Sequence, residues 1–149
     1  MKWIFGHDLD SPQTNKLISI ALLIIRLQMG IAFILHGWPK IQHAFSWMPP
    51  GAPIPGVLQG LAAFSEFGGG IALILGVLTR LNALGLLITM TVAALFHISQ
   101  GDPFVGFSGS WEPAAVYWAL SLMFLLIGPG NYSLDKMICR KKTNYKAMS

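Results

Sequence analysis

Two side chains of opposite charge, Arg26 and Glu66, stand inside long apolar stretches of the sequence. A lone charge in the middle of a bilayer costs about 2.5–3.5 kcal/mol on insertion scales, so ionisable residues in membrane spans usually have a partner and a function. A guanidinium can grip a carboxylate through two parallel hydrogen bonds. We therefore predict that Arg26 and Glu66 pair, either to dock two helices or to form a polar site for a ligand or a proton.

Two histidines and a lysine lie near the ends of long apolar stretches. His36 and His97 are expected at similar heights on two helices, and Lys40 follows His36 closely. Imidazole groups in this arrangement can bind a quinone carbonyl, relay protons or ligate haem. Because neither an HxxxH nor an ExxH spacing is present, we expect no metal, with haem held by His36 and His97 as the weaker alternative. No catalytic residue is assigned, and the ligand-binding candidates are Arg26, His36, Lys40, Glu66 and His97.

The composition indicates which elements must position these residues. Hydrophobic residues make up 54% of the 149 residues and charged residues only 11%, with a mean hydropathy of +0.59. A soluble domain carries roughly 25% charged residues, so this chain has too little charge to coat a globule. Four stretches approach the ~20 residues that a membrane helix needs: 17–38, 57–78, 81–98 and 111–128. The sequence therefore predicts an all-α integral membrane four-helix bundle, formed as one domain over residues 1–149.

The positions of the basic residues predict the orientation of these spans. If four spans alternate, Lys40 lies in a loop on one side and Arg26 within a span, and the remaining basic residues fall on the other side. The positive-inside rule then places both termini in the cytoplasm. The basic tail, residues 136–149, is interpreted as a topology anchor at anionic lipid. No aromatic interleaving or motif supports nucleic acid as a partner.

Arg26 and Glu66 are expected at the same depth. Counted from the start of the first two spans, each lies about 14 Å into the membrane, from opposite faces. Five prolines between residues 39 and 56 predict a loop on the outer side, because proline interrupts a helix. This loop is interpreted either as a lid over a site or as a rigid spacer.

Several sequence segments, taken in order, resemble the DoxX family of small four-helix membrane proteins. They are "RLQMGIAFILHGWPKI" with Arg26 and Lys40, "EFGGGIALILGVLTRLNALGLLITM" with Glu66, then His97, and finally "GPGNYSLD". The resemblance covers about residues 26–135. It implies a multi-pass protein of the bacterial inner membrane. It also implies a link to terminal quinol oxidase, to thiosulfate:quinone oxidoreductase or to redox-stress complexes, although a family resemblance does not fix a reaction.

Three functions follow as hypotheses. The first is a quinone-linked redox subunit, or an accessory or assembly partner, of a membrane or periplasmic oxidoreductase, with a quinone as the expected cofactor. The single cysteine excludes an internal dithiol pair, so such a subunit would receive electrons from elsewhere rather than act as a catalyst alone. The second is a small proton-coupled transporter or exporter, and the third is a structural scaffold. Whether the chain forms a homo-oligomer stays open at this point.

Overall fold

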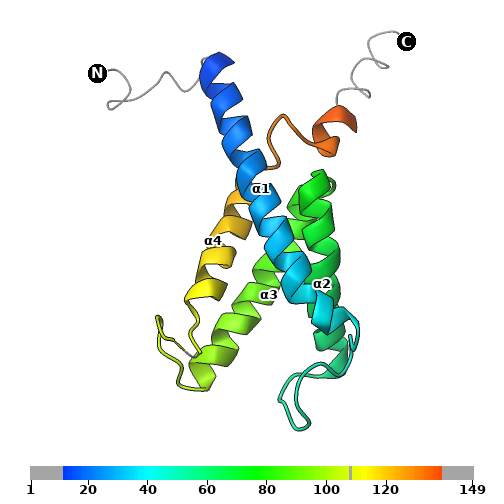
Figure 1. Cartoon of the computed structure of the whole chain (residues 1–149), viewed down its shortest axis with the longest axis vertical. Coiled ribbons are helices and arrows are strands. Elements are labelled where there is room, and N and C mark those ends of the chain that lie inside the picture. The colour runs from blue at the N-terminus through cyan, green and yellow to red at the C-terminus, as the bar shows by residue number, and fades with distance from the viewer. Residues whose placement is uncertain (1–11, 108, 139–149) are drawn as a thin grey trace.

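The structure, a computed structural model, describes residues 12–107 and 109–138. It contains four main helices, α1 (Pro12–Ile41), α2 (Gly56–Leu75), α3 (Thr79–Ser99) and α4 (Glu112–Ile127), and a short helical stretch over residues 134–138, and these described ranges contain no strand. The helices form one elongated bundle (Figure 1). The prediction of an all-α membrane bundle is therefore confirmed.

The lengths of the helices differ from those of the predicted spans. Three helices, α1, α2 and α3, are long and apolar enough to cross a membrane, whereas α4 is an apolar helix of only 16 residues. The 30-residue helix α1 starts five residues before the predicted span and continues through Pro39. Pro39 lies in the last turn of α1, so the hydrogen bond that its missing N–H removes and the bend that its ring imposes fall at the end of the helix. The prediction that the loop starts at residue 39 is wrong, and the loop begins after Ile41.

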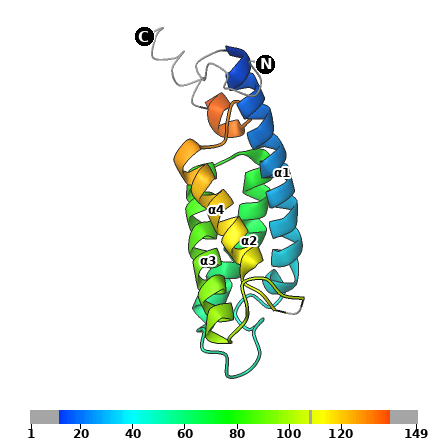
Figure 2. The same cartoon turned by 90° about the vertical axis from the view of Figure 1, so that its left-hand side faces the viewer.

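Helices that are consecutive in the chain pack on each other, most extensively α1 with α2 and α3 with α4, and α1 makes few contacts with α4 (Figures 1 and 2). The α1–α2 contact is the closest. A Cβ atom on Gly30 would lie 2.7 Å from the carbonyl oxygen of Gly70, and one on Gly37 would lie 2.5 Å from the backbone nitrogen of Phe67. Small residues let membrane helices approach in this way. The glycines therefore fix the register of α1 against α2.

All four helices contribute to the buried core. Its fully buried large side chains are Met29 and Phe33 of α1, Leu73 of α2, Leu86 of α3 and Phe124 of α4. Many large apolar side chains point outward on every helix. An apolar exterior is the expected surface of a bundle whose solvent is lipid.

The C-terminal segment, residues 128–138, closes one end of the bundle (Figure 1). Asp135 accepts hydrogen bonds from the backbone N–H groups of Leu78 (2.8 Å) and Thr79 (2.9 Å) at the start of α3. The preceding turn needs Gly76 at φ +66° and Leu78 at φ +48°. A carboxylate at a helix N-terminus satisfies free N–H groups and complements the helix dipole. Residues far apart in the sequence thus stabilise the tight α2–α3 turn together.

Candidate functional site

Glu66 forms an ion pair with Lys40. The Nζ atom of Lys40 donates hydrogen bonds to both carboxylate oxygens of Glu66, at 2.6 and 2.7 Å. The Glu66 side chain is 3% exposed and that of Lys40 is 25% exposed. The Lys40 Nζ atom also lies 4.7 Å from the ring centroid of Trp47, a cation–π distance. The predicted Arg26–Glu66 pair is wrong, because Lys40 supplies the cation.

The register of the two helices explains this correction. Because Gly30 lies against Gly70, Arg26 of the antiparallel α1 is level with Gly76, where a Cβ atom would lie 2.6 Å from the Arg26 guanidinium. Gly76 is ten residues beyond Glu66, which is about 15 Å along α2. Lys40 comes within reach of Glu66 because α1 continues through Pro39 instead of ending before it.

Arg26 instead binds backbone carbonyl groups at the opposite end of the bundle. Its Nη1 atom donates to the oxygen of Pro129 (2.9 Å), and its Nη2 atom donates to the oxygens of Tyr132 (2.8 Å) and Ile74 (3.4 Å). Arg26 is only 1% exposed. The Ile74 carbonyl belongs to the last turn of α2, where a cation complements the helix dipole. Arg26 therefore joins α1, α2 and the C-terminal segment, and it does not belong to the Lys40–Glu66 site.

The Lys40–Glu66 pair lies on the wall of a cavity of about 690 Å³ between α2 and α3, which we call the α2–α3 cavity. Most of its lining is apolar, and several lining side chains are also exposed on the outer surface: Leu58, Leu61, Phe64, Ile88 and Val92. The cavity therefore opens toward the face that lipid covers. Its volume and apolar walls are typical of a site for a lipophilic small molecule.

The loop between α1 and α2 forms part of the same wall. Trp47, Met48 and Ile54 line the cavity. Gln59 of α2 holds this loop, because its side chain accepts from the Met48 N–H (3.0 Å) and donates to the Ile54 oxygen (2.9 Å). The indole N–H of Trp47 donates to the Gln59 carbonyl at 3.0 Å. The loop is thus fixed over the Lys40 end of the cavity, an arrangement that fits both the lid and the rigid-spacer interpretations of the proline-rich loop.

His97 also lines the cavity, and it is oriented by a carboxylate. Its Nδ1 atom lies 2.7 Å from Oδ2 of Asp102, in the loop that follows α3. This hydrogen bond leaves Nε2 as the ring nitrogen for another partner. His36, in contrast, is exposed on α1 and does not line the cavity. The structure thus brings Lys40, Glu66 and His97 to one cavity and places Arg26 and His36 elsewhere.

Sequence reasoning missed Ser65, which lines the cavity next to Glu66. Its Oγ atom is buried and has no hydrogen-bond partner among the described residues. A buried hydroxyl without a partner is costly, so its position in a cavity suits a ligand with a polar group. Its adjacency to Glu66 was visible in the sequence, but serine in an apolar helix most often bonds its own backbone.

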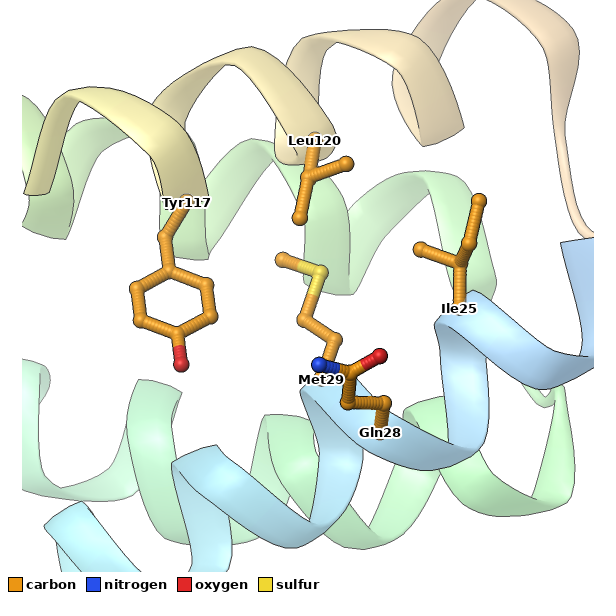
Figure 3. Close-up of a pocket in the computed structure, with 5 residues that line it drawn as sticks. All are labelled: Ile25, Gln28, Met29, Tyr117 and Leu120. Atoms are coloured by element: carbon orange, nitrogen blue, oxygen red, sulfur yellow. The ribbon is translucent and has the colours of Figure 1, made fainter. Parts of the chain in front are cut away.

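A second, smaller cavity of about 210 Å³ lies between α1 and α4. Figure 3 shows that Gln28 and Tyr117 direct their polar ends into the gap, between the apolar side chains of Ile25, Met29 and Leu120. Neither polar end has a hydrogen-bond partner within the described ranges.

The fold and the cavity define a small helical membrane protein with a polar, partly buried site between two of its spans. The chain belongs to the DoxX family, whose model matches residues 21–98. It is 32% identical over 132 residues to the inner membrane protein YqjF of Escherichia coli K12, covering 85% of this chain and 98% of that protein. It is 31% identical over 137 residues to the uncharacterized membrane protein Rv3486 of Mycobacterium tuberculosis, covering 83% and 84%. No solved structure matches the chain significantly.

These relatives and the apolar helices agree on the location of the protein. YqjF is described as an inner membrane protein, and three helices of this chain can each cross a membrane. The protein is therefore a multi-pass protein of the bacterial inner membrane, in contact with the lipid bilayer.

Proposed function

We propose that this DoxX protein is a quinone-linked subunit or assembly partner of a membrane oxidoreductase, and that the α2–α3 cavity holds the quinone. The observation that carries the proposal is the cavity itself. It combines a lipid-facing opening, apolar walls and a buried Lys40–Glu66 pair. A quinone needs both parts, because its isoprenoid tail is apolar and its ring carries two oxygen atoms that form hydrogen bonds.

The residues in the cavity fit such a ring. Lys40 has three N–H donors and uses two of them on Glu66, so the third can donate to a ring oxygen. The unpartnered hydroxyl of Ser65 and the Nε2 atom of His97 are further hydrogen-bonding groups on the same cavity. The indole of Trp47 adds an aromatic face at this end. A bound quinone would supply the electron-transfer chemistry that these side chains lack.

The ion pair would keep the polar end of the cavity in place. Two charges that satisfy each other can stay ionised in a low-dielectric site, whereas removing one partner leaves the other buried and unpaired. Glu66 thus holds the Lys40 ammonium over the cavity, and Gln59 holds the loop above it.

Extraction of the purified protein tests this proposal. The full chain is purified in mild detergent, and its lipophilic ligands are identified by mass spectrometry. We expect stoichiometric quinone in the native protein and its loss from the Lys40→Met/Glu66→Leu double variant, which removes both charges together so that neither is left buried alone. A Lys16→Met/Glu112→Gln variant changes the same charges outside the cavity and should retain quinone. A folded native protein without quinone would refute the proposal.

The length of the cavity favours a second candidate, a proton-coupled transporter. Its lining extends along α3 from Leu81 to His97, which is about 24 Å at 1.5 Å per residue. A path of this length approaches the thickness of the bilayer core. Proton uptake by proteoliposomes, measured with an internal pH dye, distinguishes the two. Flux that the double variant abolishes, without bound quinone, would favour transport.

A further inference from the structure

One face of α1 is largely exposed and regularly patterned, and Trp38 at its end also packs on Phe67 of α2, with ring centroids 5.7 Å apart. The residues Ile24, Gln28, Ile31, Leu35 and Trp38 follow one another at spacings of four, three, four and three. We call this set the α1 stripe. All five residues are exposed, the four apolar ones by 54–69%. The stripe lies on the side of α1 opposite Met29 and Phe33, which are buried in the bundle.

The alternating spacing is that of a coiled-coil seam. Positions that repeat every three and four residues form a straight line along two helices that wind around each other with a left-handed twist. Membrane helix pairs commonly adopt the same crossing angle of about +20°. Lipid itself can cover an apolar face, so the spacing alone does not indicate a protein partner. The polar side chain of Gln28 within this face is the feature that indicates one.

Gln28 is the polar residue of the stripe, and lipid cannot satisfy it. Exposed apolar side chains continue on both sides of it, from Leu17 to Trp38, which places the amide within the apolar layer. The amide has two donors and an acceptor with two lone pairs, and no described side chain or backbone group bonds to it. In hydrocarbon an unsatisfied amide is costly, and a partner helix removes the cost.

We propose that the α1 stripe is a dimer interface, at which Gln28 bonds to Gln28 of a second copy. Copies inserted by the same rules have parallel α1 helices, so a twofold axis along the membrane normal places each stripe residue opposite itself. The amide is complementary to its own copy because it both donates and accepts. A different partner would need its own polar group at this depth, whereas a second copy always supplies one.

The small cavity between α1 and α4 offers a competing explanation of how the Gln28 amide is satisfied. Gln28 lies across it from Tyr117, and a rotated amide could bond to that hydroxyl within one chain (Figure 3). The two explanations differ in what Tyr117→Phe does. If Gln28 bonds to Tyr117 within one chain, Tyr117→Phe lowers the stability of the monomer. If Gln28 bonds to its own copy instead, Tyr117→Phe removes no hydrogen bond, and association does not change.

Energy transfer between labelled copies in liposomes tests the proposal with the full chain. The single cysteine, Cys139, takes either donor or acceptor dye. We expect concentration-dependent transfer, and about 3- to 30-fold weaker association for Gln28→Leu, the range that one interhelical hydrogen bond supplies in a membrane. Gln28→Asn should retain most of the association, and Leu126→Ala, an exposed change on α4, should have no effect.

Disulfide crosslinking gives an independent measurement that leaves Gln28 intact. In a Cys139→Ser background, Leu35→Cys should crosslink to its own copy, whereas Leu95→Cys on the exposed side of α3 should not. A monomer at all lipid ratios would overturn the proposal. So would a dimer that forms equally well with Gln28→Leu, or crosslinking at Leu95→Cys but not at Leu35→Cys. Because no variant here alters the α2–α3 cavity, these outcomes are independent of quinone binding.

Discussion

Replacing Arg26 by methionine should separate the C-terminal segment from the bundle. The guanidinium makes two short hydrogen bonds, at 2.8 and 2.9 Å, and a longer one at 3.4 Å, all to backbone carbonyls. A hydrogen bond to a charged group contributes about 1.5–3 kcal/mol, and a buried carbonyl left without a partner costs about 1–3 kcal/mol. Since burying the guanidinium is itself unfavourable, we expect a net loss of about 3–5 kcal/mol in the free energy of unfolding.

Reversible unfolding in mixed detergent micelles, followed by tryptophan fluorescence, measures this loss. Arg26→Lys should recover less than half of it, because an ammonium cannot reach carbonyls on both sides as a planar guanidinium does. Limited proteolysis should also cleave Arg26→Met near residues 128–138 faster than the native chain. If Arg26→Met is as stable as the native protein and equally resistant to proteolysis, the structural role assigned to Arg26 is wrong. Its quinone content per folded molecule should not change, because Arg26 lies about 15 Å from Glu66 along the bundle.

Three further predictions follow from single contacts. Asp135→Ala should cost about 1–2 kcal/mol, because two N–H groups at the start of α3 lose their acceptor; an unchanged unfolding midpoint would contradict this. Gly70→Ala should destabilise by about 1–3 kcal/mol, since its Cβ would lie 2.8 Å from the Gly30 oxygen. A Cβ atom on the nearby Gly68 would have no atom within 4 Å, so Gly68→Ala should be neutral or stabilising. Equal changes in the free energy of unfolding for Gly70→Ala and Gly68→Ala would count against the helix register. Gln59→Ala should accelerate proteolysis of residues 42–55 without lowering helix content measured by circular dichroism, because it releases both hydrogen bonds from its side chain to the loop.

The helices were predictable from the sequence, but the pairing of the charges was not. Long apolar runs predict spans because a membrane selects helices of that length. A depth that is counted from the start of each run, however, assumes that every span begins at the membrane surface. Helix α1 begins at Pro12 and passes through Pro39, and its register is set by Gly30 against Gly70. These contacts shift Arg26 away from Glu66 and bring Lys40 to it.

The partners of Arg26 could not have been found from residue types. They are backbone carbonyls, which every residue carries, and two of them lie more than a hundred positions away in the chain. The sequence did contain a signal, because "GPGNYSLD" combines helix-ending glycines with Asp135. That pattern predicts the end of a helix but not the element that the segment then binds. His97 and Asp102 likewise meet because the chain turns back at Gly101 (φ +79°), just after α3.

The unequal lengths of the helices also affect the surrounding membrane. Helix α1, with 30 residues, is about 45 Å long, and α4, with 16, is about 24 Å long. A bilayer core about 30 Å thick is longer than α4 and shorter than α1, so the two helices have mismatches of opposite sign with the membrane. The lipid beside α4 therefore meets a shorter apolar surface than the lipid beside α1. A bilayer with shorter fatty-acid chains therefore matches the length of α4 more closely and the length of α1 less closely.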